Sequence, residues 1–197
     1  MKDKKPRLYL ILKPIIRLLM SALYRPRYFN IEKIPTDGPI ILCGNHIHAF
    51  DPLLAALSTK RVVYFLAKKE LFKWPLGSIL KSVGTIPVNR QEKDPNTTNT
   101  AEEYLNQGKV LVIMPEGTRN RTDELLLPFK FGSVSLAKKT GALIVPFAIV
   151  NQFKLFRKSV KIVFGTPIDI SDMELTIANE VLMKSVRELL ESYGDKK

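Results

Sequence analysis

His46 and Asp51 are the residues whose types and spacing most directly suggest acid–base chemistry. They lie in the segment 44–52, GNHIHAFDP, which directly follows an apolar run. On a continuous helix, residues five apart lie about 140° apart around the axis, so this pair can meet only if the chain turns between them. A carboxylate that holds one imidazole nitrogen leaves the other free to accept a proton. His48 is an alternative base, since its spacing from Asp51 does not exclude it.

The sequence supplies a base but no obvious protein nucleophile. No serine or cysteine accompanies the His–Asp pair in a nucleophile-elbow motif. The base would then activate either water or a hydroxyl group of the substrate, which makes the protein a hydrolase or a transferase. The alternative without catalysis is that Asp51 only caps a helix and His46 is an ordinary loop residue.

The segment 114–119, MPEGTR, follows another apolar run and could bind an anion. Gly117 allows close approach of the backbone, and Arg119 offers a planar fork for a phosphate. Glu116 would either hold that fork in place or contact substrate hydroxyls.

Two further cations end apolar runs. Arg90 closes the segment 84–90, GTIPVNR, and Lys68 ends the run 62–67. If these runs are parallel strands, Lys68, Arg90 and Arg119 face one rim, and convergent cations suit a phosphate headgroup. The alternatives are that each is a solvated surface charge or that Glu116, Lys68 and Arg90 pair with one another.

The elements that must position these residues alternate along the chain. Short runs rich in Val and Ile predict strands at 39–43, 61–67, 84–88, 109–114, 142–150 and 160–165. Helical patterns separate them at 52–58, 70–82, 97–107, 132–140 and 174–192. This alternation predicts an α/β fold, with a mostly parallel or mixed central sheet flanked by helices. We further expect Asp51 as a helix N-cap, a capping box of Ser171 and Glu174, and a polar loop at 91–100.

Residues 1–27 form a separate basic and apolar segment before an α/β domain at 28–197. They hold eight Lys or Arg residues and one acid, so their net charge is +7. On a helical wheel Lys13 and Arg17 share one stripe, and Pro14 should kink or divide the helix. Apolar residues cover the remaining surface, among them Leu12, Ile16, Leu19 and Leu23. The pattern predicts a helix lying in a membrane interface, and the alternative is a helix that caps the core.

The composition of the chain indicates anionic partners. The formal net charge is +12, which indicates nucleic acid, acidic lipid or phosphorylated substrates as partners. Over half of this excess lies in residues 1–27, and no nucleic-acid-binding motif is recognised, so we expect no nucleic acid partner. Cys43 is the only cysteine, which excludes an intrachain disulfide and favours a reducing compartment.

Together these segments resemble the lysophosphatidic acid acyltransferase family, within the wider glycerolipid acyltransferases, over about residues 30–170. Asn45, His46 and Asp51 match the family's N-H-x-x-x-x-D motif, 84–90 resembles its second block, 115–119 matches its third, and Val145-Pro146 resembles its fourth. The segment 67–71, outside these four, is also similar to the family. Four motifs in the family's order are far more specific than any one of them.

The resemblance implies His46 as general base and Asp51 as its partner. It implies that Glu116, Gly117, Thr118 and Arg119 bind the glycerol phosphate, assisted by Arg90 and Lys68. It also implies an acyl-CoA or acyl-carrier-protein donor, no metal or cofactor, and an N-terminal helix that binds the membrane. We therefore expect a peripheral enzyme, on the cytoplasmic face of the cell membrane, that acylates the sn-2 hydroxyl of lysophosphatidic acid. The alternatives are another lysophospholipid or glycerol 3-phosphate as acceptor, or a thioester hydrolase.

Overall fold

One mixed sheet organises the chain, whose computed structural model describes residues 7–73, 76–88 and 95–194. The strands are β1 (Arg27–Phe29), β2 (Ile40–Gly44), β3 (Val63–Lys68), β4 (Thr85–Val88), β5 (Val110–Ile113), β6 (Leu143–Val150) and β7 (Lys161–Phe164). They pair in the order β1-β7-β6-β2-β5-β3-β4. Strands β2 to β6 run parallel to one another, whereas β7 is antiparallel to β6 and β1 is parallel to β7. The predicted mixed α/β sheet is confirmed.

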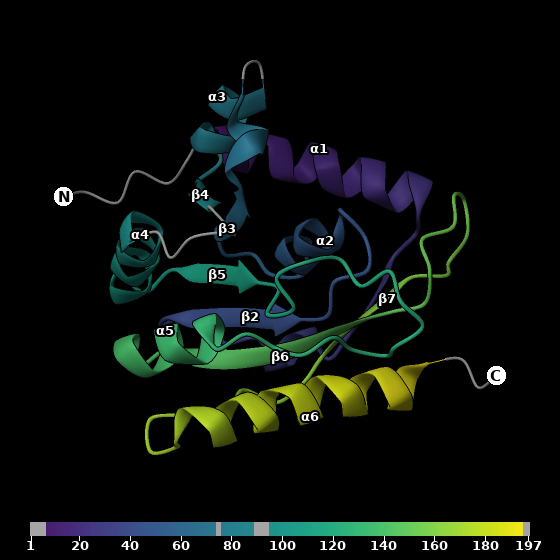
Figure 1. Cartoon of the computed structure of the whole chain (residues 1–197). Coiled ribbons are helices and arrows are strands. Elements are labelled where there is room, and N and C mark those ends of the chain that lie inside the picture. Colours follow the sequence, from purple (N-terminus) through teal and green to yellow (C-terminus); the bar gives the residue numbers. More distant parts are fainter. Residues whose placement is uncertain (1–6, 74–75, 89–94, 195–197) are drawn as a thin grey trace.

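Helices cover both faces of this sheet (Figure 1). They are α1 (Arg7–Leu23), η1 (Ile31–Lys33), α2 (Asp51–Leu57), η2 (Lys69–Phe72), α3 (Leu76–Ser82), α4 (Pro95–Asn106), α5 (Gly132–Thr140) and α6 (Leu175–Tyr193). α1 and α2 pack on one face of the sheet, and α4, α5 and α6 pack on the other. Because successive strand side chains point to opposite faces, a continuously apolar run serves both layers.

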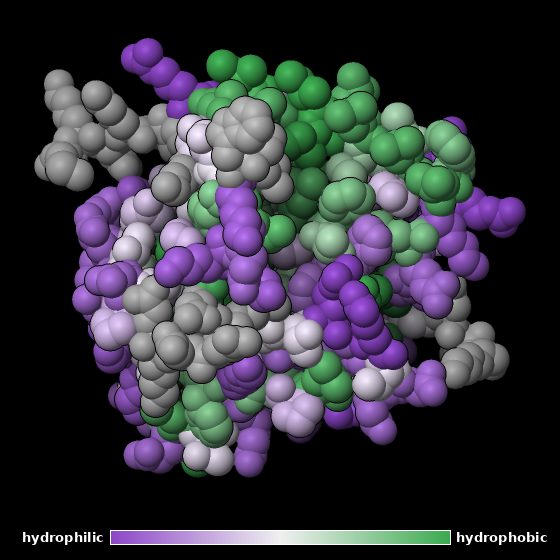
Figure 2. All heavy atoms as spheres, turned by 45° about the horizontal axis from the view of Figure 1, so that its top comes forward, coloured by the Kyte–Doolittle hydropathy of each residue, from purple (hydrophilic) through white to green (hydrophobic). Residues whose placement is uncertain are grey.

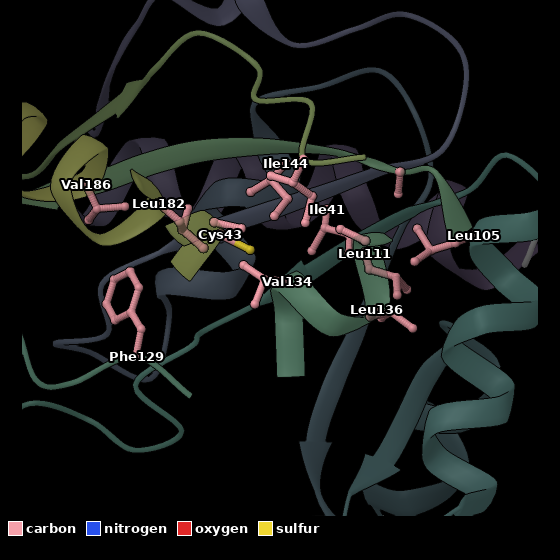
Figure 3. Packing of buried hydrophobic residues seen from close by; sticks show 14 of the residues in the cluster. Ile41, Cys43, Leu105, Leu111, Phe129, Val134, Leu136, Ile144, Leu182 and Val186 are labelled. Atoms are coloured by element: carbon pink, nitrogen blue, oxygen red, sulfur yellow. The ribbon is translucent and has the colours of Figure 1, made fainter. Parts of the chain in front are cut away.

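Figure 3 shows one of these layers, in which Val134 of α5 and Leu182 of α6 gather against Ile41 and Cys43 of β2. Cys43 is fully buried there, as a small hydrophobe, and its burial raises the thiol pKa to about 12. A thiol of this kind is unreactive near neutral pH.

All six predicted strands form, with bounds within about two residues of the predicted runs. Strand β1 was missed because its three residues, one of them arginine, make no apolar run and pair only at an edge of the sheet. The expected loop at 91–100 is wrong from Pro95 onward, where α4 begins, and residues 89–94 lie outside the described part.

Two expected helix caps are wrong. Phe50 is the N-cap of α2, and Asp51 is its first helical residue. The Asp51 carboxylate does not cap the helix, because it turns back and accepts the Ile47 N–H of the preceding loop. Glu174 is the N-cap of α6 without a side-chain bond. The capping box with Ser171 does not form, since the Ser171 amide instead donates to Asp169 Oδ1 at 3.0 Å.

Helix α1 turns its basic stripe toward the domain. Lys13 Nζ donates to the main-chain oxygens of Thr59 at 2.6 Å and Arg61 at 3.0 Å, and Arg17 donates to the Leu57 carbonyl. These carbonyls lie at and just beyond the C-terminus of α2, where unpaired oxygens and the helix dipole attract cations. The expectation that Lys13 and Arg17 face the membrane is therefore wrong. Leu12 and Ile16 are also half-buried, at the side of α1 that faces the core.

The outer face of α1 is apolar. Six large side chains are exposed along it, Leu10, Ile11, Ile15, Leu18, Leu19 and Leu23, and Figure 2 shows the apolar surface over α1. Of the predicted membrane residues, Leu19 and Leu23 belong to this face. Pro14 does not divide the helix, which continues from Arg7 to Leu23. None of the helices in the described ranges is both long and apolar enough to cross a bilayer.

Candidate functional site

The turn between β2 and α2 brings His46 and Asp51 together. His46 Nδ1 lies 3.0 Å from Asp51 Oδ2, and both residues are buried, with 8% and 0% of their surfaces exposed. The same Oδ2 accepts the main-chain N–H groups of Ile47 and His48, both at 2.6 Å. The carboxylate at the first turn of α2 thus fixes the loop as well as the ring. The chain turns between the two residues, as their spacing required, and of the two ring nitrogens Nδ1 is the one that contacts Asp51.

His48 does not share this position. Its Nδ1 accepts the Phe50 N–H at 3.3 Å, and its ring stacks on Phe153 with centroids 4.2 Å apart. Its contact with the Asp51 carboxylate is through its main-chain N–H. The geometry therefore favours His46 over His48 as the oriented base.

Glu116 holds the His46 turn from the neighbouring loop. Its Oε1 accepts the main-chain N–H of His46 at 2.7 Å, and its Oε2 accepts that of Leu127 at 3.0 Å. Glu116 is only 3% exposed, and this burial raises its carboxyl pKa against the opposing effect of the two amides. Both Glu116 oxygens therefore accept main-chain amides, and the expected contact of Glu116 with substrate hydroxyls stays a prediction.

Asn45 ties the same turn to β6. Its Nδ2 donates to the Ile149 carbonyl at 3.0 Å, and its Oδ1 accepts the Ile149 N–H at 2.7 Å. The main-chain oxygen of His46 in turn accepts the Asn120 N–H at 2.6 Å. The turn that carries His46 is therefore held by hydrogen bonds from α2, from the loop after β5 and from β6.

His46 stands between two cavities at the carboxyl edge of the parallel strands. The first has a volume of about 290 Å³ and is mostly apolar, and we name it the apolar cavity. It is lined by Leu66, Val88, Val112, Ile113, Met114 and Pro115, with Gly117 and Lys130 among its other residues. The second has a volume of about 650 Å³, and its lining includes Lys68, Arg119 and Arg121. We name it the cationic cleft. His46, Pro52 and Leu66 line both.

The structure distributes the predicted binding residues between these cavities. Thr118, Arg119 and Lys68 line the cationic cleft, although Lys68 Nζ also lies 3.2 Å from Glu70 Oε1. Gly117 lines the apolar cavity with a φ of +70°, which favours glycine. The Gly117 N–H donates to the Met114 carbonyl at 2.9 Å, so it is committed to the loop. Arg90 lies outside the described residues.

Arg121 and Lys130 are two cations at the site that the sequence reasoning missed. Arg121 lines the cationic cleft, and Lys130 lines the apolar cavity, where its side chain lies beside the Cα of Gly117. Both occur between β5 and α5, so their place in a loop at the carboxyl edge of the sheet was the available signal.

This arrangement suits an amphiphilic substrate. The cationic cleft can hold an anionic headgroup, the apolar cavity can hold a hydrocarbon chain, and the oriented imidazole between them can take a proton from a hydroxyl. Within the described ranges, no group of three or more His, Cys, Asp or Glu side chains is arranged to hold a metal ion.

Known proteins resemble this chain in sequence and fold. The acyltransferase family model matches residues 25–150. The 1-acyl-sn-glycerol-3-phosphate acyltransferase of Bacillus subtilis (strain 168) is 28% identical over 188 residues, which cover 88% of this chain and 92% of that protein. The protein of the same name from Borreliella burgdorferi is 36% identical over 134 residues, or 66% of this chain and 52% of that protein.

A solved structure shows the same fold. The crystal structure of the 1-acyl-sn-glycerophosphate acyltransferase PlsC from Thermotoga maritima superposes with a TM-score of 0.78, at 23% sequence identity. The match covers 98% of this chain and 83% of that one.

Proposed function

This chain belongs to the acyltransferase family, and from that premise we propose that it acylates the sn-2 hydroxyl of lysophosphatidic acid, giving phosphatidic acid. The names of its relatives support this acceptor, since they are 1-acyl-sn-glycerol-3-phosphate acyltransferases. The observation that carries the proposal is the position of the oriented His46–Asp51 pair between a cationic cleft and an apolar cavity.

In the proposed reaction His46 is the general base. Its Nε2 takes the proton from the acceptor hydroxyl while that oxygen attacks the carbonyl carbon of the donor thioester. The imidazolium that forms is stabilised by the Asp51 carboxylate at Nδ1. The C–S bond of the tetrahedral intermediate then breaks, the oxygen ester forms, and the sulfur takes the proton from the His46 imidazolium and leaves as the free thiol. Binding both reactants beside the base lowers the activation barrier by roughly several kcal/mol, because their translational and rotational freedom is already lost on binding.

The phosphate of the acceptor binds in the cationic cleft. Arg119 offers two parallel N–H donors to phosphate oxygens, and Arg121 and Lys68 add positive charge at the same rim. The cleft borders His46, so a phosphate bound there would keep the glycerol hydroxyl near the base.

The hydrocarbon chain of the donor occupies the apolar cavity. Its lining is apolar on the β3 and β5 side, which suits methylene groups. The donor is acyl-CoA or acyl-carrier protein, and the chemistry needs no metal or cofactor because the thioester already activates the acyl group.

We further propose that the enzyme sits on the cytoplasmic face of the cell membrane as a peripheral protein. The exposed apolar face of α1, including Leu18 and Leu19, would lie in the interface. In this arrangement the basic stripe of the helix is not the membrane contact, since Lys13 and Arg17 bind carbonyls of the domain.

An acceptor panel tests the proposal. The purified protein is given one labelled acyl donor, either acyl-CoA or, in parallel, carrier protein loaded with the same acyl group. Each donor is combined with lysophosphatidic acid, lysophosphatidylcholine, glycerol 3-phosphate or no acceptor. The products are identified by mass spectrometry. We expect phosphatidic acid with lysophosphatidic acid, no product with His46→Ala, and retained transfer with the matched variant His48→Ala. Equal use of lysophosphatidylcholine would overturn the acceptor, and equal release of free fatty acid without any acceptor would indicate a thioester hydrolase.

A further inference from the structure

The loop between β6 and β7 presents two large apolar side chains to solvent. Leu155 and Phe156 are 56% and 65% exposed at its tip. Three exposed cations flank them, Lys154, Arg157 and Lys158, and the segment 151–159 contains no acid. This exposed apolar pair does not pack into the core on either side of the sheet. An exposed apolar patch of this kind indicates a surface that binds another molecule or a membrane.

The main chain holds this tip in place. Phe156 adopts a φ of +59°, a left-handed conformation that is costly for an aromatic residue. Its N–H donates to the carbonyl of Leu23, the last residue of α1, at 2.5 Å. The loop is therefore fastened to the C-terminal end of α1, and Figure 1 shows it rising beside that end.

The first residues of the loop pack on the turn that carries His46 and Asp51. Phe153 stacks on His48 with ring centroids 4.2 Å apart and meets the Tyr24 ring edge-on at 5.3 Å. His48 lies two residues after His46 in the same turn. The end of α1, the loop and the catalytic turn thus share one aromatic cluster.

From these contacts we infer that the β6–β7 loop is a second membrane contact, in which Leu155 and Phe156 enter the interface of an anionic bilayer and Lys154, Arg157 and Lys158 bind its phosphates. Apolar tips flanked by cations suit an anionic lipid surface, because the apolar side chains and the charges bind different layers of it. The inference rests on the proposed membrane contact of α1, whose exposed Leu23 adjoins the loop. Two contacts would fix the orientation of the protein and hold the catalytic turn against the leaflet that contains its lipid substrate.

Site-specific fluorescent labelling separates this contact from that of α1. Cys43 is fully buried, so an introduced surface thiol can be labelled selectively with an environment-sensitive fluorophore. The variants Phe156→Cys, Leu18→Cys and Ile177→Cys place the label on the loop, on α1 and on α6. Ile177 is the matched control, since it is 53% exposed and α6 packs on the opposite face of the sheet from α1.

With vesicles of phosphatidylglycerol and phosphatidylethanolamine, we expect the labels at positions 156 and 18 to shift to shorter emission wavelengths, while the label at 177 does not. A shift at 18 alone would overturn the loop contact and leave that of α1 standing. A shift at neither position would overturn both. Acyl transfer by the unmodified chain in detergent tests the proposed reaction separately.

Charge removal gives a second measurement. Replacing Lys154, Arg157 and Lys158 with Gln should weaken the affinity for these vesicles, measured by co-sedimentation, about tenfold or more. Each of the three cations near an anionic surface contributes favourably to binding, so the loss of all three adds up. The charge-matched control replaces Lys138, Lys139 and Lys184, which lie on α5 and α6, and should change it less than about twofold. An equal loss in both triple variants would show that only net charge matters and would overturn the inference.

Discussion

The Glu116 carboxylate accepts the main-chain N–H of His46 at 2.7 Å, across 70 positions of sequence. Its second oxygen accepts the Leu127 N–H, so one buried side chain joins the catalytic turn to the loop that follows β5. Arg119 and Arg121 of that loop line the cationic cleft. We therefore interpret Glu116 as a positioning residue that sets the distance between His46 and the arginines of the cationic cleft.

Glu116→Gln should lower kcat more than it changes KM. The amide oxygen can accept one of the two N–H groups, but its NH2 group opposes the other, and an unpaired buried N–H costs about 1–3 kcal/mol. We expect kcat to fall about tenfold or more through displacement of the His46 turn, with either KM changed by less than about twofold. Steady-state kinetics with varied donor and acceptor measure this. Glu124→Gln, at an exposed position of the same loop, is the control, and a large rise in the acceptor KM would instead assign Glu116 to substrate binding.

The sequence predicted the parts of the site that depend on local order. A His and an Asp five apart, directly after a buried run, can meet only through a turn, and the six Val- and Ile-rich runs form a sheet whose parallel strands end at one rim. Lys68 and Arg119 therefore lie in the same cleft.

The parts that it did not predict depend on distant main-chain groups. The sequence contains no signal that Glu116 pairs with the amides of His46 and Leu127, because any acid in that loop would look the same. The helical wheel found the basic stripe of α1 but not its direction. That direction depends on the carbonyl oxygens at the end of α2, which Lys13 and Arg17 satisfy.

Asp51→Asn should remove most of the activity while the turn persists. The Asn oxygen can still accept N–H groups from the main chain, but the neutral amide neither stabilises an imidazolium nor enforces the tautomer with Nδ1 protonated. We expect kcat to fall by about three to four orders of magnitude, as in other His–Asp systems. The KM for lysophosphatidic acid should remain close to that of the wild type. A loss of less than about tenfold in kcat would show that Asp51 serves only the loop.

Arg121→Ala should weaken acceptor binding in the same way as Arg119→Ala. Both side chains line the cationic cleft, and a charge-assisted hydrogen bond to phosphate contributes about 1.5–3 kcal/mol, or roughly a tenfold to hundredfold change in affinity. We expect the KM for lysophosphatidic acid to rise by that factor and the KM for the donor to stay within about twofold. Arg187→Ala on α6 is the matched control, and an unchanged acceptor KM in Arg121→Ala would remove this residue from the phosphate site.

Met114→Trp should shift the donor preference toward shorter acyl chains. Met114 lines the apolar cavity beside Ile113, and the larger indole would occupy part of its volume of about 290 Å³. Chains too long for the remaining space should lose kcat/KM, whereas short chains should keep it. A competition assay with mixed acyl-CoA lengths measures the preference. An equal loss for every chain length would indicate a general disturbance of the loop, contrary to the assignment of this cavity to the chain.

Lys13 should give the protein a pH-dependent stability above neutral pH. Burial, and to a lesser extent the charge of Arg17, lowers the pKa of Lys13 from 10.5 to about 8 in the folded protein. Between these values the unfolded chain holds a proton that the folded chain has released, so the free energy of unfolding rises with pH across this window. The side chain is partly exposed, which screens the effect to about 1 kcal/mol at most.

Urea unfolding of the wild type and of Lys13→Met between pH about 8 and 10.5 isolates the contribution of Lys13, because the other alkaline titrations cancel in the difference. The stability of the wild type relative to Lys13→Met should increase with pH, since the neutral amine still donates to Thr59 and Arg61 without the cost of a buried charge. A difference that stays constant or falls would mean that Lys13 remains charged against the end of α2.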